Sequence, residues 1–431
     1  MVGLSRRRVA LGAWLAVLVA VGPAWLRFTS MTERMVLAGI LGIAGILLAA
    51  WAVRRGRHAL VGLIATVAAT GVGEVVLEQR LPAAGRTITS NDHNRLFDHD
   101  PRIGWRFRPG ADERVITPDY GQRVRINSAG FRDVEPTAAT GNRHTVLVLG
   151  DSFVSNLGVP LEQVFTRVLE RRLGPGIEVR NHGVNGYGQV QQLMLLEELL
   201  VKDDPALVLI VVYARNDFDD NLGLFDWIRG YRRPRSTETR SGGIELKRAG
   251  RPSPARTGLF ARCCGNLRAT AWHRVLRQAL ARRQLDRLPA HSRPPELRYC
   301  AHRHGARERQ GVEMTGRLLA RMAELAGEHG ARAAVVIAPS AWQADAARWA
   351  ALLEYYRLDP EDFDRERPQA SIATACHRAS IPCLDLLPVL EQFTGRGESL
   401  YYPREAHWTA LGNRRVAESI EEWLVDEVGL P

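Results

Sequence analysis

The sequence predicts an α/β protein in which helices cover both faces of a parallel sheet. From residue 144 onward, apolar strand-like runs alternate with helix-like segments, and this alternation is typical of parallel strands joined by crossover helices. Residues 206–213 are apolar throughout, as in a strand covered on both faces. A chain of 431 residues, 45% hydrophobic and 24% charged, is long enough for one large domain with accessory segments or for two domains of ordinary size.

The alternation predicts the elements in order. Strands are expected at residues 144–149, 177–180, 206–213, 332–338 and 382–386. Helices are expected at residues 159–173, 187–201, 312–329, 341–356, 368–379 and 409–425. The interval 222–310 is rich in Gly, Pro and Arg, and it predicts an insertion with a hairpin near Gly242–Leu246 and a helical piece around 266–287.

Residues 1–79 contain three dense hydrophobic blocks, at 9–26, 35–53 and 59–73. Each is near the roughly 20 residues that cross a bilayer as a helix, so we expect three transmembrane helices. Arginines precede the first block and follow the second, which favours a cytoplasmic N-terminus. Three crossings then place the rest of the chain outside the cytoplasm, as the periplasmic or extracellular part of a multi-pass membrane protein. A cleaved signal peptide followed by core helices is one alternative, and it explains only the first block. The opposite topology, which would keep the main domain inside the cytoplasm, is another, because the third block is the weakest.

Residues 80–142 lack a long apolar run and carry several turn signals. Short alternating segments at 103–107 and 123–126 predict small strands. We interpret this region as a lead-in between the membrane region and the main domain, which spans residues 143–431 and contains the 222–310 insertion.

The formal net charge of +11 comes almost wholly from arginine, because Lys202 and Lys247 are the only lysines. Much of the excess lies in residues 230–310. No recognition motif or set of interleaved aromatic residues accompanies this charge, so we do not expect a nucleic-acid partner. An arginine-biased composition with attraction to anionic lipid headgroups or an acidic glycan is the simpler interpretation.

The five cysteines are Cys263, Cys264, Cys300, Cys376 and Cys383, and no two of them form a Cys-x-x-Cys pair. Their spacing fits no zinc site, and we expect neither a metal nor a cofactor. In an exported domain, Cys376 could pair with Cys383 across a helix-to-strand turn, and Cys300 with Cys263 or Cys264. Free buried thiols are the equal alternative.

Four short motifs follow one another in order along the chain. Residues 145–152 form an apolar strand-like run that ends in Gly-Asp-Ser. A run from Asn181 to Gly186 follows the next predicted strand, and Asn216 follows the third. The last motif, Glu405-Ala-His407, lies just before the final predicted helix. Acyl transfer by serine needs a nucleophile, a base, an acid that orients the base, and donors for the oxyanion, and the four motifs contain candidates for each.

Each candidate has a functional and a structural interpretation. Ser152 is the nucleophile or a helix N-cap, and His407 is the general base. Glu405 orients the imidazole or is a solvated loop carboxylate. The oxyanion hole would be formed by Ser152, Gly186 and Asn216, although Gly186 also suits a tight turn and Asn216 a turn cap. The order and the setting of the four motifs together favour the functional interpretations.

These motifs resemble the four blocks of the SGNH (GDSL-type) hydrolases, and the resemblance runs from Val146 to about Leu424. The family's serine, glycine, asparagine and histidine fall on Ser152, Gly186, Asn216 and His407. The family's usual acid is an aspartate two or three residues before the histidine, whereas this chain has Glu405 and Arg404 there. The resemblance implies a flavodoxin-like, three-layer α/β/α domain with a parallel sheet.

Members of this family mostly cleave esters, often acyl groups on carbohydrates or lipids. The resemblance therefore implies a membrane-anchored serine esterase that acts on acylated envelope glycans or lipids. Some membrane-linked relatives instead move acetyl groups onto exported polysaccharides, and their His-Trp pair resembles His407-Trp408. An O-acyltransferase with the same residues, working with a membrane acyltransferase partner, is thus the second interpretation, and a non-catalytic binding module is the third.

Overall fold

A computed structural model describes residues 96–136 (except 118), 144–224, 231–238, 243–250 and 297–429. All of them belong to one compact unit, composed of Thr87–Ser253 and Arg287–Pro431. The three N-terminal hydrophobic blocks, the helical piece expected around 266–287, and the cysteines at 263 and 264 lie outside the described residues. Among the described helices, none combines the length and the apolar character that a membrane crossing requires. The transmembrane spans therefore stay predictions.

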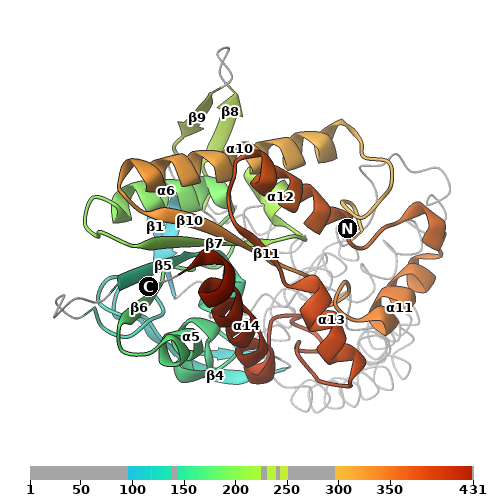
Figure 1. The fold of residues 1–431 in the computed structure, drawn as a ribbon, viewed down its shortest axis with the longest axis horizontal. Coiled ribbons are helices and arrows are strands. Elements are labelled where there is room, and N and C mark those ends of the chain that lie inside the picture. Colours follow the sequence, from blue (N-terminus) through green and yellow to red (C-terminus); the bar gives the residue numbers. More distant parts are fainter. Residues whose placement is uncertain are drawn as a thin grey trace, which may run out of the picture. The chain divides into compact units, whose positions relative to one another are not determined.

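A five-stranded parallel sheet forms the centre of the described unit, with the strand order β11-β10-β7-β5-β6 (Figure 1). Its strands are β5 (His144–Leu149), β6 (Ile177–Asn181), β7 (Leu207–Tyr213), β10 (Arg332–Ala338) and β11 (Cys383–Asp385). Numbered along the chain, this order is 2-1-3-4-5, the flavodoxin-like order in which the chain reverses direction across the sheet beside the first strand. The alternating pattern thus predicted all five strands and their parallel pairing.

Helices cover both faces of the sheet. Successive strand residues point to opposite faces, so each strand contributes apolar side chains to both. Along β7, Val208, Ile210 and Val212 belong to one apolar core, and Leu207, Leu209 and Val211 belong to another. The first core is covered by α6 (Gln189–Leu199), α10 (Ala306–Glu328) and α12 (Arg367–Arg378) (Figure 1). The second is covered by α5 (Phe165–Leu173), α13 (Leu387–Gly395) and α14 (Ala410–Trp423). The fold is therefore the expected three-layer α/β/α arrangement.

Some helix boundaries differ from the sequence-based prediction. The helix expected at 159–173 is divided: a short helix α4 (Ser152–Ser155) ends at Asn156 with φ of 31°, a 3₁₀ turn η3 (Leu161–Gln163) follows, and α5 begins only at Phe165. Pro160 lies before this turn, and a proline disfavours helical conformation in the residue preceding it. Ser152 consequently opens its own helix instead of leading into the long one.

Three further helices differ from the prediction. Helix α10 begins at Ala306, six residues earlier than predicted. Helix α11 (Ala346–Tyr356) begins five residues later than predicted, because the Asp345 side chain caps it by accepting from the N–H groups of Ala347 and Arg348. Helix α13 was not predicted at all. It has a proline in its first turn, where a missing N–H costs nothing.

The lead-in forms two antiparallel hairpins that pack on the α/β layers. They are β1 (Phe97–Asp100) with β2 (Gly104–Phe107), and β3 (Asp112–Ile116) with β4 (Gly121–Arg125). Part of the insertion forms a third hairpin, β8 (Arg235–Glu238) with β9 (Ile244–Lys247), close to where one was expected. Trp105 and Phe107 are completely buried and share the core of α6, so burial of these aromatic rings supplies most of the attachment.

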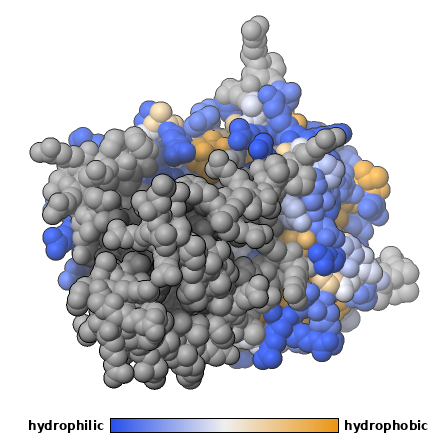
Figure 2. Space-filling view, turned by 180° about the vertical axis from the view of Figure 1, so that it is seen from behind, coloured by the Kyte–Doolittle hydropathy of each residue, from blue (hydrophilic) through white to orange (hydrophobic). Residues whose placement is uncertain are grey.

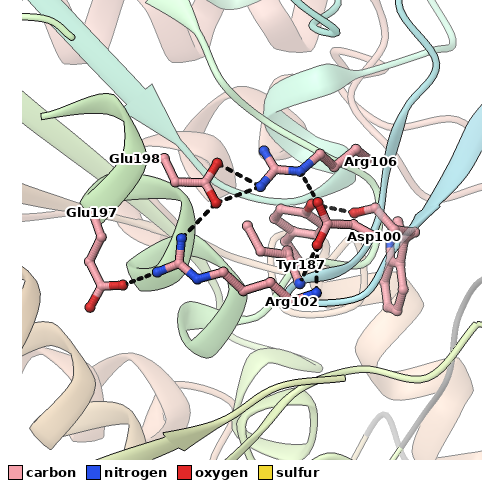
Figure 3. Close-up of polar contacts among 8 residues, drawn as sticks. Asp100, Arg102, Arg106, Tyr187, Glu197 and Glu198 are labelled. Carbon is pink, nitrogen blue, oxygen red and sulfur yellow. Dashed lines mark hydrogen bonds and ion pairs between the residues drawn. The ribbon is translucent and has the colours of Figure 1, made fainter. Parts of the chain in front are cut away.

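Ion pairs add direction to this attachment. Figure 3 shows Arg102 and Arg106 of the first hairpin reaching Glu197 and Glu198 on α6. Asp100 joins the cluster through Arg106. These side chains are between 19% and 39% exposed, so each pair contributes at most about 1 kcal/mol. Their main effect is to fix the register of the hairpin on the helix.

The face seen in Figure 2 is mostly hydrophilic over its described residues, with scattered hydrophobic ones. Across the described ranges, the large hydrophobic side chains that are exposed are Val134, Val201 and Val425. Isolated exposed residues of this kind are normal on a globular surface. They form no apolar docking patch.

Candidate active site

Ser152 lies just after the carboxyl end of β5. This is the first strand of the sheet along the chain, and the strand order reverses beside it. Gly150 connects the strand to Ser152, and a Cβ atom on this glycine would lie only 2.2 Å from Cγ2 of Val154. Asp151 caps α4 by accepting from the Phe153 N–H at 2.8 Å. The N-cap is therefore the aspartate, which leaves the Ser152 hydroxyl for another role.

His407 reaches Ser152 from the other end of the chain. Its Nε2 atom is 2.8 Å from Ser152 Oγ, a hydrogen-bond distance. Tyr402 donates its N–H to the His407 carbonyl at 2.8 Å, and the buried Trp408 packs its ring 4.8 Å from that of Phe153. The loop is thus held on both sides of the histidine, and the pair has the geometry of a nucleophile and its base.

Glu405 lies beside the second imidazole nitrogen but does not hydrogen-bond to it. The distance from Glu405 Oε2 to His407 Nδ1 is 3.9 Å, which is an ion-pair separation and too long for a hydrogen bond. The Glu405 side chain is only 14% exposed. Burial, and then the negative charge of Asp119, raise the pKa of Glu405 to about 7. Glu405 is therefore not a fully solvated loop carboxylate.

Asp119, in the turn between β3 and β4, also holds the histidine loop. Its Oδ2 atom accepts from the backbone N–H groups of Arg404 and Glu405, at 2.8 and 2.7 Å. The ring of the next residue, Tyr120, packs 5.2 Å from the ring of Tyr402. The lead-in thus touches the candidate acid directly. The sequence marked this position only as a turn, because the chain gives no local sign that residues 119 and 405 meet.

Gly186 follows β6 and has a φ of 77°, a left-handed conformation that side chains other than glycine rarely adopt. Among the described residues no acceptor is recorded for its N–H. Its carbonyl accepts from Arg233 at 2.9 Å. The Gly186 carbonyl is thus occupied by Arg233, whereas the Gly186 N–H is compatible with donating a hydrogen bond to a substrate oxygen.

Asn216 follows β7 and precedes α7 (Asp217–Asn221), and it makes no side-chain capping bond to that helix. Its Nδ2 atom donates to Asp220 Oδ2 at 2.6 Å and lies 3.4 Å from Asp217 Oδ1. The first contact is a strong charge-assisted bond and the second is weak. The Asn216 amide is therefore anchored chiefly through Asp220, and its second hydrogen makes only the weak contact with Asp217. The absence of a capping bond argues against the turn-cap interpretation.

Three buried carboxyl groups lie close to these candidates in the chain, those of Asp151, Asp217 and Asp220. Burial, and then the charge of Asp220, raise the pKa of Asp151 to about 7. Burial, and then the charges of Asp151 and Asp220, raise the pKa of Asp217 well above its ordinary value. Asp217 Oδ2 accepts from Gln189 Nε2 and from the Tyr213 N–H, at 2.7 and 2.9 Å. These carboxyl groups contact the segments that follow the strands. The sequence did not predict their role, because it does not show that the three residues lie close together.

Cys376 and Cys383 are free thiols, and Cys300 is buried. Cys376 and Cys383 lie within hydrogen-bonding reach of each other, as expected, and this contact, followed by burial, raises the pKa of the Cys383 thiol. The structure thus has thiols where a disulfide was one of two alternatives.

Comparisons with known proteins match the end of the chain that carries His407. Residues 300–429 match the family model "SGNH hydrolase-like domain, acetyltransferase AlgX". The matched range includes Glu405 and His407 but not Ser152, Gly186 or Asn216, which the fold brings to the same edge of the sheet. No significant match was found among curated proteins.

Several crystal structures are similar at low sequence identity. TesA is 16% identical with a TM-score of 0.34, over 67% of this chain and 100% of that one. The acetyl xylan esterase AlAXEase is 11% identical with a TM-score of 0.35, over 64% of this chain and 98% of that one. Est24, a carbohydrate acetylesterase from Sinorhizobium meliloti, is 13% identical with a TM-score of 0.34, over 66% and 99%.

Proposed function

We propose that this protein is an O-acyltransferase that places acyl groups, acetyl above all, on hydroxyl groups of an exported polysaccharide. The observation that carries the proposal is the 2.8 Å contact between Ser152 Oγ and His407 Nε2, in a chain whose residues 300–429 match an acetyltransferase domain. The catalytic roles of Ser152, His407, Glu405, Gly186 and Asn216 are part of the proposal.

The first half-reaction forms an acyl-enzyme. The Ser152 hydroxyl donates its proton to His407 Nε2 as Oγ attacks the carbonyl carbon of an ester-type donor. The negative charge moves onto the carbonyl oxygen, where the N–H groups of Ser152 and Gly186 and the Asn216 amide stabilise it. The tetrahedral intermediate then expels the donor oxygen, which takes the proton from His407. Glu405 stabilises the imidazolium that forms in between.

The second half-reaction transfers the acyl group. A sugar hydroxyl gives its proton to His407 and attacks the Ser152 ester carbon, and collapse releases the acylated sugar as Ser152 Oγ recovers the proton. Esterase activity is the second candidate, with water in place of the sugar. The His407 side chain is 25% exposed, which leaves water a path to the acyl-enzyme and favours some hydrolysis.

A half-buried tryptophan offers a contact for the acceptor. Trp342 follows β10, which neighbours β7, and the guanidinium of Arg215, the residue before Asn216, lies 5.4 Å from its ring centroid. Aromatic faces combine a large apolar contact with a defined orientation, as the apolar face of a sugar requires. We therefore propose Trp342 as a contact for the polysaccharide and not for the acyl donor.

The cellular setting is also a proposal. The three N-terminal hydrophobic blocks support a membrane-anchored protein whose SGNH domain lies outside the cytoplasm. Such a domain can receive acyl groups from a membrane acyltransferase partner and deliver them to an envelope glycan. A lipid substrate remains the alternative acceptor.

The proposal is tested with the full-length protein and p-nitrophenyl acetate, with and without a deacetylated polysaccharide. We expect p-nitrophenol release in both cases and acetyl transfer to the polysaccharide in the second. Ser152→Ala should abolish both, whereas Ser371→Ala on α12 should abolish neither. Trp342→Ala should raise the KM for the polysaccharide and leave the release of p-nitrophenol without acceptor unchanged.

The outcomes separate the alternatives. Release without transfer, whatever polysaccharide is offered, would establish an esterase and refute the transferase. A wild-type protein that neither releases p-nitrophenol nor reacts with a fluorophosphonate would be a binding module.

A further inference from the structure

Arg233 is a buried arginine of the insertion that contacts both sides of the candidate oxyanion hole. Its Nη2 atom donates to the Gly186 carbonyl at 2.9 Å and lies 3.2 Å from Asp220 Oδ1. Its Nη1 atom donates to the Asp220 carbonyl at 3.1 Å. In the sequence this residue counts only toward the arginine excess of residues 230–310, but the guanidinium is almost fully enclosed.

Asp220 passes the contact on to Asn216. Its Oδ2 atom accepts from Asn216 Nδ2 at 2.6 Å while Oδ1 faces Arg233. One guanidinium therefore connects the backbone of Gly186 with the side chain of Asn216 through a single carboxylate. Gly186 follows β6 and Asn216 follows β7, two strands that are not adjacent in the sheet.

Trp105 of the lead-in holds the same loop from a second direction. Its Nε1–H donates to the Asn185 carbonyl at 2.9 Å, and the Tyr187 hydroxyl donates to the Trp105 carbonyl. The Arg233 guanidinium lies 5.5 Å from the centroid of the Trp105 ring. The neighbouring Arg102 and Arg106 fasten this hairpin to α6, with Tyr187 beside them in Figure 3.

We propose that Arg233 is a positioning residue that sets the separation of the two oxyanion donors, Gly186 and Asn216. The inference rests on the proposed function, because it assumes that these donors stabilise an oxyanion. Donors act only when they lie about 2.7–3.1 Å from the developing charge, and misplacement by about 1 Å can cost a hundredfold in rate. An arginine suits this task because its planar fork reaches several acceptors at fixed angles, which a lysine does not.

The test compares two variants of the full-length protein, each normalised by fluorophosphonate titration of active sites. Arg233→Lys keeps the charge beside Asp220 but loses the fork, and we expect kcat for p-nitrophenyl acetate to fall about tenfold with KM within about twofold. Arg233→Met also removes the charge, and we expect a fall of about a hundredfold. The matched control is Arg232→Met, which alters the exposed arginine next to it.

A double variant shows whether Arg233 acts through the oxyanion donors. Asn216→Ala removes the donor that Arg233 positions, so adding Arg233→Lys should cost clearly less than it does alone. Trp105→Phe, which removes the Nε1–H donor and keeps an aromatic ring, should lower kcat by a smaller factor.

Specific results overturn the inference. If Arg233→Lys and Arg233→Met turn over at the wild-type rate per titrated site, Arg233 has only a structural role. Independent, multiplicative effects of Arg233→Lys and Asn216→Ala would also refute the positioning role. In both cases Ser152→Ala still tests the proposed function. If instead the wild type is inert and unlabelled, the proposed function fails, and the role of Arg233, which rests on it, fails with it. Should Arg233→Met fail to fold, Arg233→Lys alone decides.

Discussion

The charge of Asp119 is expected to control the acidic limb of the pH–rate profile. The pKa of Glu405 stands at about 7 against an ordinary value of 4.5, with burial as the larger cause and Asp119 as the second. Since one pH unit corresponds to about 1.4 kcal/mol, ionising this carboxyl in the fold costs on the order of 3 kcal/mol more than in water. Asp119 accounts for at most half of the rise.

Asp119→Asn removes this charge and keeps the contacts. An asparagine oxygen can still accept from the N–H groups of Arg404 and Glu405, which now lie 2.8 and 2.7 Å from the carboxylate. A carboxyl with a raised pKa is protonated below that pKa, so activity that needs ionised Glu405 is lost as the pH falls through about 7. Removing the nearby negative charge lowers this pKa, and the acidic limb should move to lower pH by up to about one pH unit.

The assay is kcat/KM for p-nitrophenyl acetate between pH 5 and 9, measured with the wild type and Asp119→Asn. Asp112→Asn is the matched control, because it removes a carboxylate of the same hairpin that is paired with Arg123. The acidic limb should move to lower pH whether the proton is on Glu405 or on His407, since a negative charge favours the protonated form of either group. An acidic limb that stays in place or moves to higher pH would refute the reasoning. In that case Glu405→Gln should behave like the wild type, and the working unit would be a serine–histidine dyad.

Two further predictions follow from the structure, and a third follows from the sequence. Asn216→Ala should lower kcat by about two to three orders of magnitude with little change in KM, and a change confined to KM would make Asn216 a binding residue. Arg132→Met should lower the free energy of unfolding by about 3 kcal/mol in denaturant titrations, because the buried guanidinium donates to the carbonyls of Ser155, Asn156 and Val159; unchanged stability would contradict this. An alkaline phosphatase fused after Arg80 should be active, and activity of a cytoplasm-only reporter there would instead reverse the proposed topology.

Local patterns were sufficient to predict the sheet and the identity of the candidate residues. Strands such as β5 and β7 are continuous apolar runs, and such runs are visible without knowing their neighbours. Ser152 and His407 stand out because each lies in a short motif at the end of a predicted element. The structure then places their side chains 2.8 Å apart, although 254 residues separate them in the chain.

Other features depend on contacts between segments that are far apart in sequence. The separation of Glu405 from His407 and the elevated pKa of Glu405 depend on a turn near residue 119, which the motif does not include. Arg233 reads as one arginine in a basic run, and only its enclosure between Gly186, Asp220 and Trp105 distinguishes it. Burial and charge proximity set these properties, and neither is a property of a short stretch of sequence.

The sequence by itself determined the α/β class, the five parallel strands and the four motifs, because periodicity and residue type are local. Only the tertiary structure decided that the lead-in and the insertion contribute Asp119, Trp105 and Arg233 to the site. It also decided that Ser152 opens its own short helix. The physical reason is that a hydrogen bond or a buried charge acts over a few ångströms in space, whatever the distance along the chain.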